Sequence, residues 1–306
     1  MSMSTPSTSV PSLVAGAHEA TSQAALAARR TAFRALHGRG CFVIPNPWDV
    51  GSARYLQHLG FPALATTSAG FAFSQGRSDS GDDVVISRNR SLAHIASITT
   101  AVDVPVTADF MSGYGLEPED VAESVARCVA TGVAGLSIED ATGDPTSPLY
   151  ELRIAVERVR AAREAIDRSG DDVLLTARAE CYHVGHPDPH RESVRRLQAY
   201  AAAGADVLFA PGPQSPAEIK ALVDAVAPKP LNLLVVRDIG LRVADIAALG
   251  VRRISVGGAL ALAAWTGVTR AAQTLKSEGS FAGLANLVPY AEINGLFAAD
   301  LERPRG

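Results

Sequence analysis

The stretch VAGLSIED at residues 133–140, followed by a helical segment and then by VLLTARAE at residues 173–180, decides the fold of this chain. The apolar runs from Gly135 to Ile138 and from Val173 to Ala177 predict two buried strands, and the spacing of apolar residues from Leu152 to Ile166 predicts a helix between them. Such strand–helix–strand units bring the carboxyl ends of parallel strands together. Because both strands end in charged residues, we expect polar side chains to converge there.

Units of the same kind recur along the whole chain. The other strand-like runs are Cys41 to Ile44, Ala63 to Thr66, Val104 to Ala108, Val207 to Ala210, Leu231 to Val235 and Arg253 to Val256, which makes eight candidates. The other helical patterns are Ala24 to His37, Val50 to Leu59, Arg90 to Ala101, Pro118 to Thr131, His190 to Ala203, Pro216 to Val226 and Val243 to Leu249. Eight units without a linker predict a (β/α)8 TIM barrel of the α/β class, and the missing GxGxxG motif disfavours a doubly wound sheet.

The ends of the chain differ from its middle. Residues 1–22 are rich in Ser, Thr, Pro and Ala and predict a flexible tail, so the single barrel domain is expected over residues 23–306. The segment from Phe281 to Phe297 is apolar and lies beyond the eighth unit. We expect it to form a helical extension that packs on the barrel or on a neighbouring subunit.

Composition restricts the possible partners of the protein. The 306 residues include 28 basic and 32 acidic ones, so no strong field favours nucleic acid or an anionic membrane surface. The three cysteines lie far apart without CxxC spacing, and no apolar run reaches the roughly 18 residues that span a bilayer. We therefore expect a cytoplasmic protein that acts on a small molecule.

Acidic residues follow two neighbouring strands. Asp109 ends the third predicted strand, and Glu139 with Asp140 ends the fourth. Carboxylates are hard oxygen ligands that suit Mg²⁺, with Mn²⁺ as the alternative ion. Their other possible roles are to cap the following helices or to pair with Arg178. Their shared location favours a metal site.

Other candidates lie at further strand ends. Arg178 has the planar charge needed to bind a substrate carboxylate or phosphonate by two parallel hydrogen bonds. Its other possible role is a salt bridge to Glu139 or Glu180, and the two roles are compatible. Small-residue turns that offer backbone N–H groups to an anion are predicted at Ser68, Ala69 and Gly70, and at Ser255 with Gly257 and Gly258. Trp48 is either a wall of the pocket or barrel packing.

Three histidines follow the fifth strand as an H-x2-H-x3-H series at His183, His186 and His190. Imidazole is a common transition-metal ligand. However, Pro187 and Pro189 interrupt any helical face that would align the three rings. We therefore interpret the segment as a loop beside the mouth of the barrel, with a zinc site as the alternative.

The motifs SAGF, D-x-x-x-G-Y-G, IED, ARAE and S-x-GGA occur in this order, and together they resemble the isocitrate lyase and phosphoenolpyruvate mutase superfamily over about residues 28–297. The resemblance implies a barrel whose eighth helix is exchanged between paired subunits of a dimer or tetramer. It also implies a Mg²⁺-bound 2-oxo or 2-hydroxy acid that reacts through an enolate-like species.

The resemblance also implies roles for individual residues. Asp109 and Glu139 match metal-shell carboxylates, Ser68 with Ala69 and Gly70 matches the carboxylate cradle, and Arg178 matches the substrate clamp. Two more positions match the family pattern: Asp79 corresponds to a mobile-loop aspartate, and Asn232 to a polar residue on the substrate side. Together with Trp48, Ser255 and Gly257, these residues form the predicted site.

The sequence also departs from the family pattern. The lyase branch places a K-K/R-C-G-H loop after IED to supply an acidic cysteine, whereas residues 141–150 read ATGDPTSPLY, and only Thr142 or Thr146 loosely matches the gating residue of the mutase branch. Met111 stands where many relatives have a second acid, and FAPG at residues 209–212 replaces a strand end that carries a glutamate in the lyases. The substrate is therefore left open by the sequence.

Three functions are compatible with these observations. The favoured one is a Mg²⁺-dependent lyase that cleaves a carbon–carbon bond in a small 2-oxo or 2-hydroxy acid, including decarboxylation of an oxaloacetate-like acid. The second is a phosphonomutase or phosphonopyruvate hydrolase. The third is a barrel that binds a metabolite without turning it over, which Met111 and the missing cysteine loop suggest.

Overall fold

The computed structural model describes residues 12–79 and 86–302. The first part of the predicted tail, residues 1–11, lies outside this range. Helix α1, Ser12–Gly38, begins well before the expected start near Ala24 and occupies the second part of the predicted tail.

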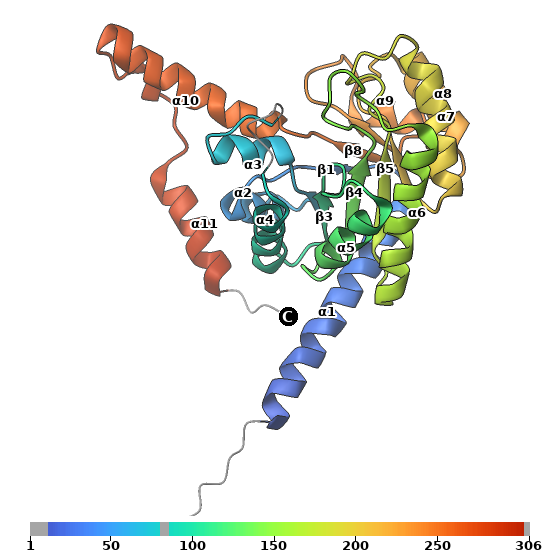
Figure 1. Cartoon of the computed structure of the whole chain (residues 1–306). Coiled ribbons are helices and arrows are strands. Elements are labelled where there is room, and N and C mark those ends of the chain that lie inside the picture. The colour runs from blue at the N-terminus through green and yellow to red at the C-terminus, as the bar shows by residue number, and fades with distance from the viewer. Residues whose placement is uncertain (1–11, 80–85, 303–306) are drawn as a thin grey trace, which may run out of the picture.

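Eight parallel strands form the centre of the molecule (Figure 1). They are β1 Phe42–Ile44, β2 Leu64–Ala65, β3 Val106–Asp109, β4 Gly135–Glu139, β5 Leu174–Arg178, β6 Val207–Phe209, β7 Leu231–Leu234 and β8 Arg253–Ser255, in the order β1-β8-β7-β6-β5-β4-β3-β2. The two strands at the ends of this order approach each other where the Ala65 N–H donates to the Pro45 carbonyl oxygen at 3.0 Å. The predicted (β/α)8 barrel, nearly closed, is confirmed.

Helices surround the strands, and most of them lie where the sequence places them. They are α2 Val50–His58, α3 Ser68–Ser74, α4 Arg88–Ala101, α5 Pro118–Val129, α6 Leu152–Ser169, α7 Pro189–Ala202, α8 Pro216–Val226 and α9 Val243–Ala248. Hydroxyl groups cap two of the predicted starts, since Ser87 accepts from the Arg90 N–H and Ser215 from the Glu218 N–H.

Helix α3 corrects the predicted turn at Ser68, Ala69 and Gly70. The segment is the first turn of a helix, because the Thr67 hydroxyl accepts the Gly70 N–H at 3.2 Å and caps it. Seven residues are too few to show a helical period in the sequence.

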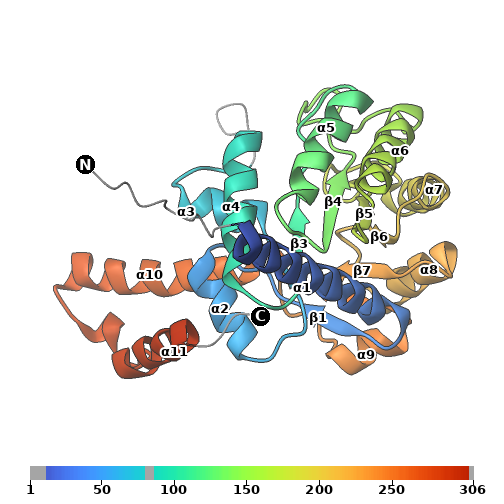
Figure 2. The same ribbon diagram turned by 90° about the horizontal axis from the view of Figure 1, so that it is seen from below.

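Helix α1 closes the end of the barrel opposite the mouth (Figure 2). Phe33 is fully buried there and packs with Phe42, Ile44 and Leu174 from the strands. Arg30 donates to the carbonyl oxygens of Val129 and Val133. The substrate must therefore enter from the other end, where the strands finish.

The C-terminal helices leave the barrel. Helix α10, Ala259–Glu278, projects from the mouth, and after the short 3-10 helix η1, Ala282–Leu284, helix α11, Tyr290–Glu302, lies beside α2 (Figure 1). Arg54 and Asp300 form an ion pair of 3.2 Å between α2 and α11. The region from Phe281 to Phe297 is thus not one helix, because η1 and an irregular segment precede Tyr290. Within the described ranges, no helix is both long enough and apolar enough to cross a bilayer.

Candidate active site

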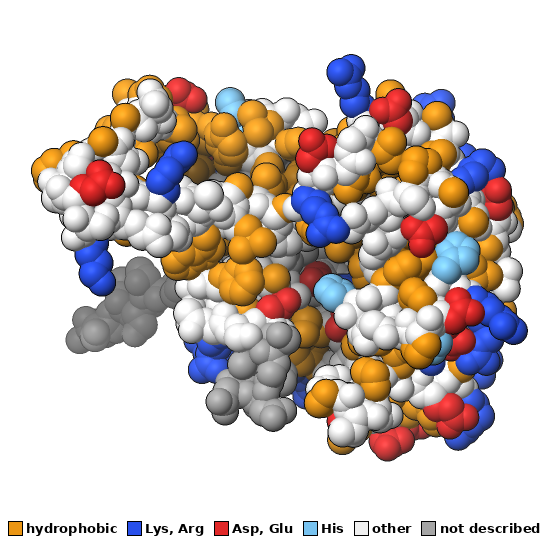
Figure 3. All heavy atoms as spheres, turned by 90° about the horizontal axis from the view of Figure 1, so that it is seen from above, with side chains coloured by type: hydrophobic (Ala, Val, Ile, Leu, Met, Phe, Trp, Pro, Cys, Tyr) orange, Lys and Arg blue, Asp and Glu red, His pale blue; other side chains and the backbone are white. Residues whose placement is uncertain are grey.

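Three charged residues end three consecutive strands of the barrel: Asp109 on β3, Glu139 on β4 and Arg178 on β5. Glu139 is the register partner of Arg178, and Asp109 is that of Ser137. Because the strands are parallel, all three side chains reach the same mouth. Figure 3 shows this face of the molecule, with acidic and histidine side chains gathered around a central hollow.

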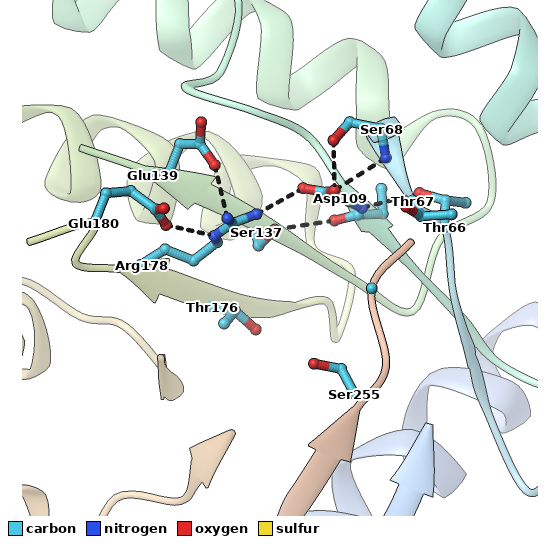
Figure 4. A network of polar contacts seen from close by, with 12 residues as sticks. Thr66, Thr67, Ser68, Asp109, Ser137, Glu139, Thr176, Arg178, Glu180 and Ser255 are labelled. Carbon is cyan, nitrogen blue, oxygen red and sulfur yellow. Dashed lines mark hydrogen bonds and ion pairs between the residues drawn. The ribbon is translucent and has the colours of Figure 1, made fainter. Parts of the chain in front are cut away.

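The guanidinium of Arg178 lies at the centre of a ring of carboxylates (Figure 4). Its Nη1 lies 3.0 Å from Asp109 Oδ1, its Nη2 3.1 Å from Glu139 Oε2 and its Nε 2.8 Å from Glu180 Oε1. Burial alone would lower the pKa of Arg178, but the carboxylates, Glu180 foremost, raise it above its usual value. Arg178 therefore forms the salt bridges that the sequence left as the alternative to a free substrate clamp.

Asp109 is held by the start of helix α3. The backbone N–H and the hydroxyl of Ser68 both donate to Asp109 Oδ2, at 3.0 Å and 2.9 Å. The Asp109 N–H donates to the Thr66 hydroxyl at 2.9 Å. The Ser68 N–H, predicted to cradle a substrate anion, thus positions a carboxylate of the protein itself.

Gly70 and Trp48 pack together beneath this contact. A Cβ added to Gly70 would lie 2.8 Å from the Trp48 Cβ, and neither residue lines the cavities at the mouth. The Gly70 N–H is already bonded to Thr67. In this structure Trp48 therefore has the packing role that was one of its two expected roles. Ala69 does line the smaller cavity.

The site has more negative than positive charge. Burial, with Glu180 and Asp109 nearby, raises the pKa of Glu139 to about 8, even though Arg178 opposes this shift. Burial and the charge of Asp109 raise the pKa of Asp79 to about 6. A raised pKa on a buried carboxyl group means that the site does not fully compensate the charged form.

Glu180 and His183 complete the ring. The charge of Arg178 lowers the pKa of Glu180 against the effect of its burial. A contact of 3.2 Å to Glu180 Oε2 raises the pKa of His183. Even with His183 protonated, the described part of the chain places three positive groups, His183, Arg178 and Arg253, beside the four carboxyl groups of Asp79, Asp109, Glu139 and Glu180.

Two cavities meet at Asp109. The smaller, about 320 Å³, lies over the centre of the barrel, and its polar wall includes Arg178, Asn232 and Ser255. The larger, about 810 Å³, extends toward α4 and α5 and is lined by Glu139, Met111 and Tyr114 among others. Thr66, Thr67, Ser68, Asp79 and Asp109 line both cavities.

The residues present fit a divalent cation. In residues 12–79 and 86–302 no group of three His, Cys, Asp or Glu side chains converges in a way that would hold a metal. Mg²⁺, however, takes only one or two protein carboxylates and keeps several waters. Asp109 and Glu139 provide two carboxylates on the cavity wall, and a cation there would offset the excess negative charge.

The histidine series is not a metal site in the described part of the chain. His183 contacts Glu180, the His186 ring accepts the Asp188 N–H at 3.1 Å, and His190 contacts the Tyr182 hydroxyl at 3.0 Å. Each ring thus has a partner of its own.

Two segments beside the site differ from the family pattern, as the sequence showed. Met111 has a left-handed backbone (φ 51°), and its carbonyl oxygen accepts the Glu139 N–H at 2.9 Å. In the loop after β4, Thr142 lines the larger cavity, while the Thr146 hydroxyl is bound to Asp144 at 2.7 Å. Neither a cysteine nor a histidine of this loop is present to act as an acid.

Sequence reasoning assigned no role to Asn46, which ties three strand ends together. Its Oδ1 accepts the N–H groups of Val256 and Gly257, both at 2.9 Å, and its Nδ2 donates to the Thr66 carbonyl oxygen. The N–H of Gly257, predicted to bind an anion, is therefore occupied. The signal for Asn46 was its place two residues after the end of β1.

Asp140 is directed away from the mouth. It accepts from the Tyr200 hydroxyl, from Arg196 at 3.0 Å and from the Glu180 N–H at 2.8 Å. It fixes the segment that carries Glu180 and is not available as a metal ligand.

Comparison with known proteins shows what this chain is similar to. The profile of the family described as phosphoenolpyruvate phosphomutase matches residues 33–276. An uncharacterised protein of Mycobacterium tuberculosis (strain H37Rv) is 32% identical over 262 residues, which cover 85% of this chain and 94% of that protein. A crystal structure from Burkholderia cenocepacia J2315, suggested to be a lyase or mutase, is 45% identical, with 90% of this chain and 97% of that one covered and a TM-score of 0.84. The structure of 2,3-dimethylmalate lyase, a member of the PEP mutase/isocitrate lyase superfamily, is 29% identical, with 90% and 95% covered and a TM-score of 0.77.

Proposed function

The chain belongs to the phosphoenolpyruvate phosphomutase family, within the PEP mutase/isocitrate lyase superfamily, and on this premise we propose that it is a Mg²⁺-dependent lyase. Its reaction is cleavage of a carbon–carbon bond in a small 2-oxo or 2-hydroxy carboxylic acid through an enolate-like intermediate. The similarity to 2,3-dimethylmalate lyase over 90% of the chain supports the choice of lyase chemistry.

The observation that carries the proposal is the pair Asp109 and Glu139 on the wall of the larger cavity, whose charges the single guanidinium of Arg178 compensates only in part. These two carboxylates would hold the cation, and Mn²⁺ would replace Mg²⁺ there. The bound ion would stabilise the negative charge that develops on an oxygen of the substrate. Arg178 keeps both carboxylates in place through its contacts of 3.0 Å and 3.1 Å.

Asp79 is the proposed proton-transfer residue. It lines both cavities, and its raised pKa of about 6 leaves it able to hold or release a proton near neutral pH. From this position Asp79 would act as the acid or base of the reaction, in place of the cysteine that the loop after β4 lacks. Asn232 and Ser255, on the opposite side of the smaller cavity, would bind the polar groups of the substrate.

The same proposal includes an oligomer. Helix α10 carries Leu262, Trp265 and Val268, which are 46–58% exposed, and Phe281 and Tyr290 beyond it are 74% and 83% exposed. An apolar surface of this kind marks an interaction site. Because α10 projects from its own barrel (Figure 2), we expect a second copy of the chain to cover it, as in the swapped dimer or tetramer that the resemblance implies.

The test is turnover of 2-oxo acids, 2-hydroxy acids and phosphonates with and without Mg²⁺. Asp109→Asn should lower Mg²⁺-dependent turnover by about 100-fold or more, since a metal contributes several kcal/mol to the transition state. Asp167→Asn, on the exposed surface of α6, is the matched control. Turnover confined to phosphonates would instead identify a phosphonomutase or hydrolase, and ligand binding without any turnover would identify a binding barrel. Full activity of Asp109→Asn would refute the metal assignment.

A further inference from the structure

Two arginines line the smaller cavity, and they differ in how their charge is balanced. Arg178 has a carboxylate at each of its nitrogens. Arg253, on β8, is only 4% exposed, and its contacts are to neutral groups. Its Nε donates to Asn232 Oδ1 at 2.7 Å and its Nη2 to the Thr176 hydroxyl at 3.1 Å, while its Nη1 lies 3.4 Å from His37 Nε2.

His37 does not supply a compensating charge. Its Nδ1 lies 2.8 Å from the Phe33 carbonyl oxygen, so this nitrogen carries the hydrogen and Nε2 is an acceptor toward Arg253. Burial, and then the charge of Arg253, lower the pKa of His37 to about 3, which keeps the ring neutral. Burial lowers the pKa of Arg253 to about 9, so that the guanidinium still carries its charge near pH 7.

The hydrogen-bonding capacity of Arg253 is not used up. A guanidinium has five N–H donors, and three contacts leave two of them for another acceptor. A buried cation without a counter-charge is costly, and an anion that entered the cavity would remove this cost. Asn232 donates to the Ser255 hydroxyl at 2.9 Å and so holds a second polar group beside Arg253.

We propose that Arg253, supported by Asn232 and Ser255, forms an anion subsite in the smaller cavity that binds a carboxylate or phosphonate group of the substrate. This group is a second one, distinct from the end of the substrate that faces Asp109 and Glu139. The inference rests on the proposed function and adds to it that the substrate carries two anionic groups. It also gives Arg253 a role in binding the substrate like the one that the resemblance implies for Arg178.

The experiment compares three probes by isothermal titration calorimetry, with and without Mg²⁺. Succinate and its monoamide succinamate differ by one charge, and 3-phosphonopropionate replaces one carboxylate by a phosphonate. A charge-assisted hydrogen bond corresponds to about a 10- to 100-fold change in affinity. Wild-type protein should therefore bind succinate at least about tenfold more tightly than succinamate.

The variants assign this preference to one residue. Arg253→Gln should bind succinate and succinamate equally, and Arg253→Lys, which keeps the charge, should retain part of the preference. Arg252→Gln is the matched control, because the neighbouring arginine lies outside the barrel and donates to the Gly40 carbonyl oxygen. Thermal melting checks that each variant is folded, and Arg253→Lys serves if the glutamine variant unfolds.

The outcomes separate the subsite from the metal assignment. A preference for succinate that persists without Mg²⁺ and is lost in Arg253→Gln supports the subsite even if Asp109 proves not to bind metal. Tighter binding of the phosphonate than of succinate supports it too and identifies the preferred group. Equal binding of succinate and succinamate by wild-type protein, or no binding of any probe, would overturn the inference. If the subsite is overturned, Mg²⁺-dependent turnover of a monoanionic acid would still support the proposed lyase function.

Discussion

Replacing Glu139 by glutamine should stabilise the metal-free protein at pH 7, and Mg²⁺ should cancel most of this gain. The folded protein raises the pKa of Glu139 from 4.5 to about 8. At pH 7 the unfolded chain has this group ionised, whereas the folded chain must keep it protonated. The difference of about 2.5 pH units corresponds to a cost of about 3 kcal/mol in the free energy of unfolding.

The sign of this effect follows from the direction of the shift. Because the folded-state pKa is raised, the cost is absent below pH 4.5 and grows as the pH rises toward 8. The glutamine side chain of the variant resembles the protonated acid and can still accept from Arg178. We therefore expect ligand-free Glu139→Gln to be more stable than wild type at pH 7, by up to about 3 kcal/mol, and equally stable near pH 4.

Mg²⁺ should remove most of this difference in stability between wild type and Glu139→Gln. An ion at 100 times its dissociation constant stabilises the wild-type fold by about 2.7 kcal/mol, while a variant without the carboxylate gains much less. Urea denaturation at pH 4 and pH 7, with and without Mg²⁺, measures the free energy of unfolding of each protein under these four conditions. Glu164→Gln, on the exposed face of α6, is the control and should follow wild type. A Glu139→Gln protein that is less stable than wild type at pH 7, or that gains as much from Mg²⁺, would refute the reasoning.

Two further predictions concern other parts of the fold. His37 is buried with its pKa lowered from 6.5 to about 3, so its own contribution to the stability of the wild-type protein should fall by about 1.4 kcal/mol per pH unit below pH 6.5, or about 2 kcal/mol at pH 5. Relative to wild type, His37→Gln should therefore gain about 2 kcal/mol between pH 7 and pH 5 in urea denaturation, and an identical slope would contradict the buried neutral ring. Trp265→Glu combined with Val268→Glu on α10 should convert the proposed oligomer to a monomer in light-scattering measurements; a mass equal to that of wild type would contradict a subunit contact through α10.

The local pattern of the sequence was enough for most of the barrel. Each of the eight predicted strands is present within one or two residues of its expected limits, because a buried strand is a short apolar run between turn residues. Prediction failed at one short helix and at one segment of small and polar residues. Helix α3 has seven residues, and α1 extends into a Ser- and Ala-rich segment that composition alone does not distinguish from a tail.

The site was predictable only in part. The position of Asp109 and Glu139 at the ends of neighbouring strands follows from the order of the strands along the chain. Arg253 was overlooked, although it lies two residues before Ser255 on β8. Side chains two residues apart in a strand lie on the same face of the sheet, so Arg253 faces the same side as Ser255. An arginine in a predicted strand is expected to face solvent, unless it is known which residues of that strand point into the barrel.

The sequence by itself determined the succession of strands and helices and the end of the barrel where polar groups gather, since both depend on neighbours along the chain. Only the tertiary structure decided which charges are paired. Arg178 is balanced by Asp109, Glu139 and Glu180 from three strand ends, while Arg253 faces neutral groups. The physical reason is that charge balance in a buried site depends on distances of about 3 Å between residues far apart in the sequence, and the packing of the barrel sets those distances.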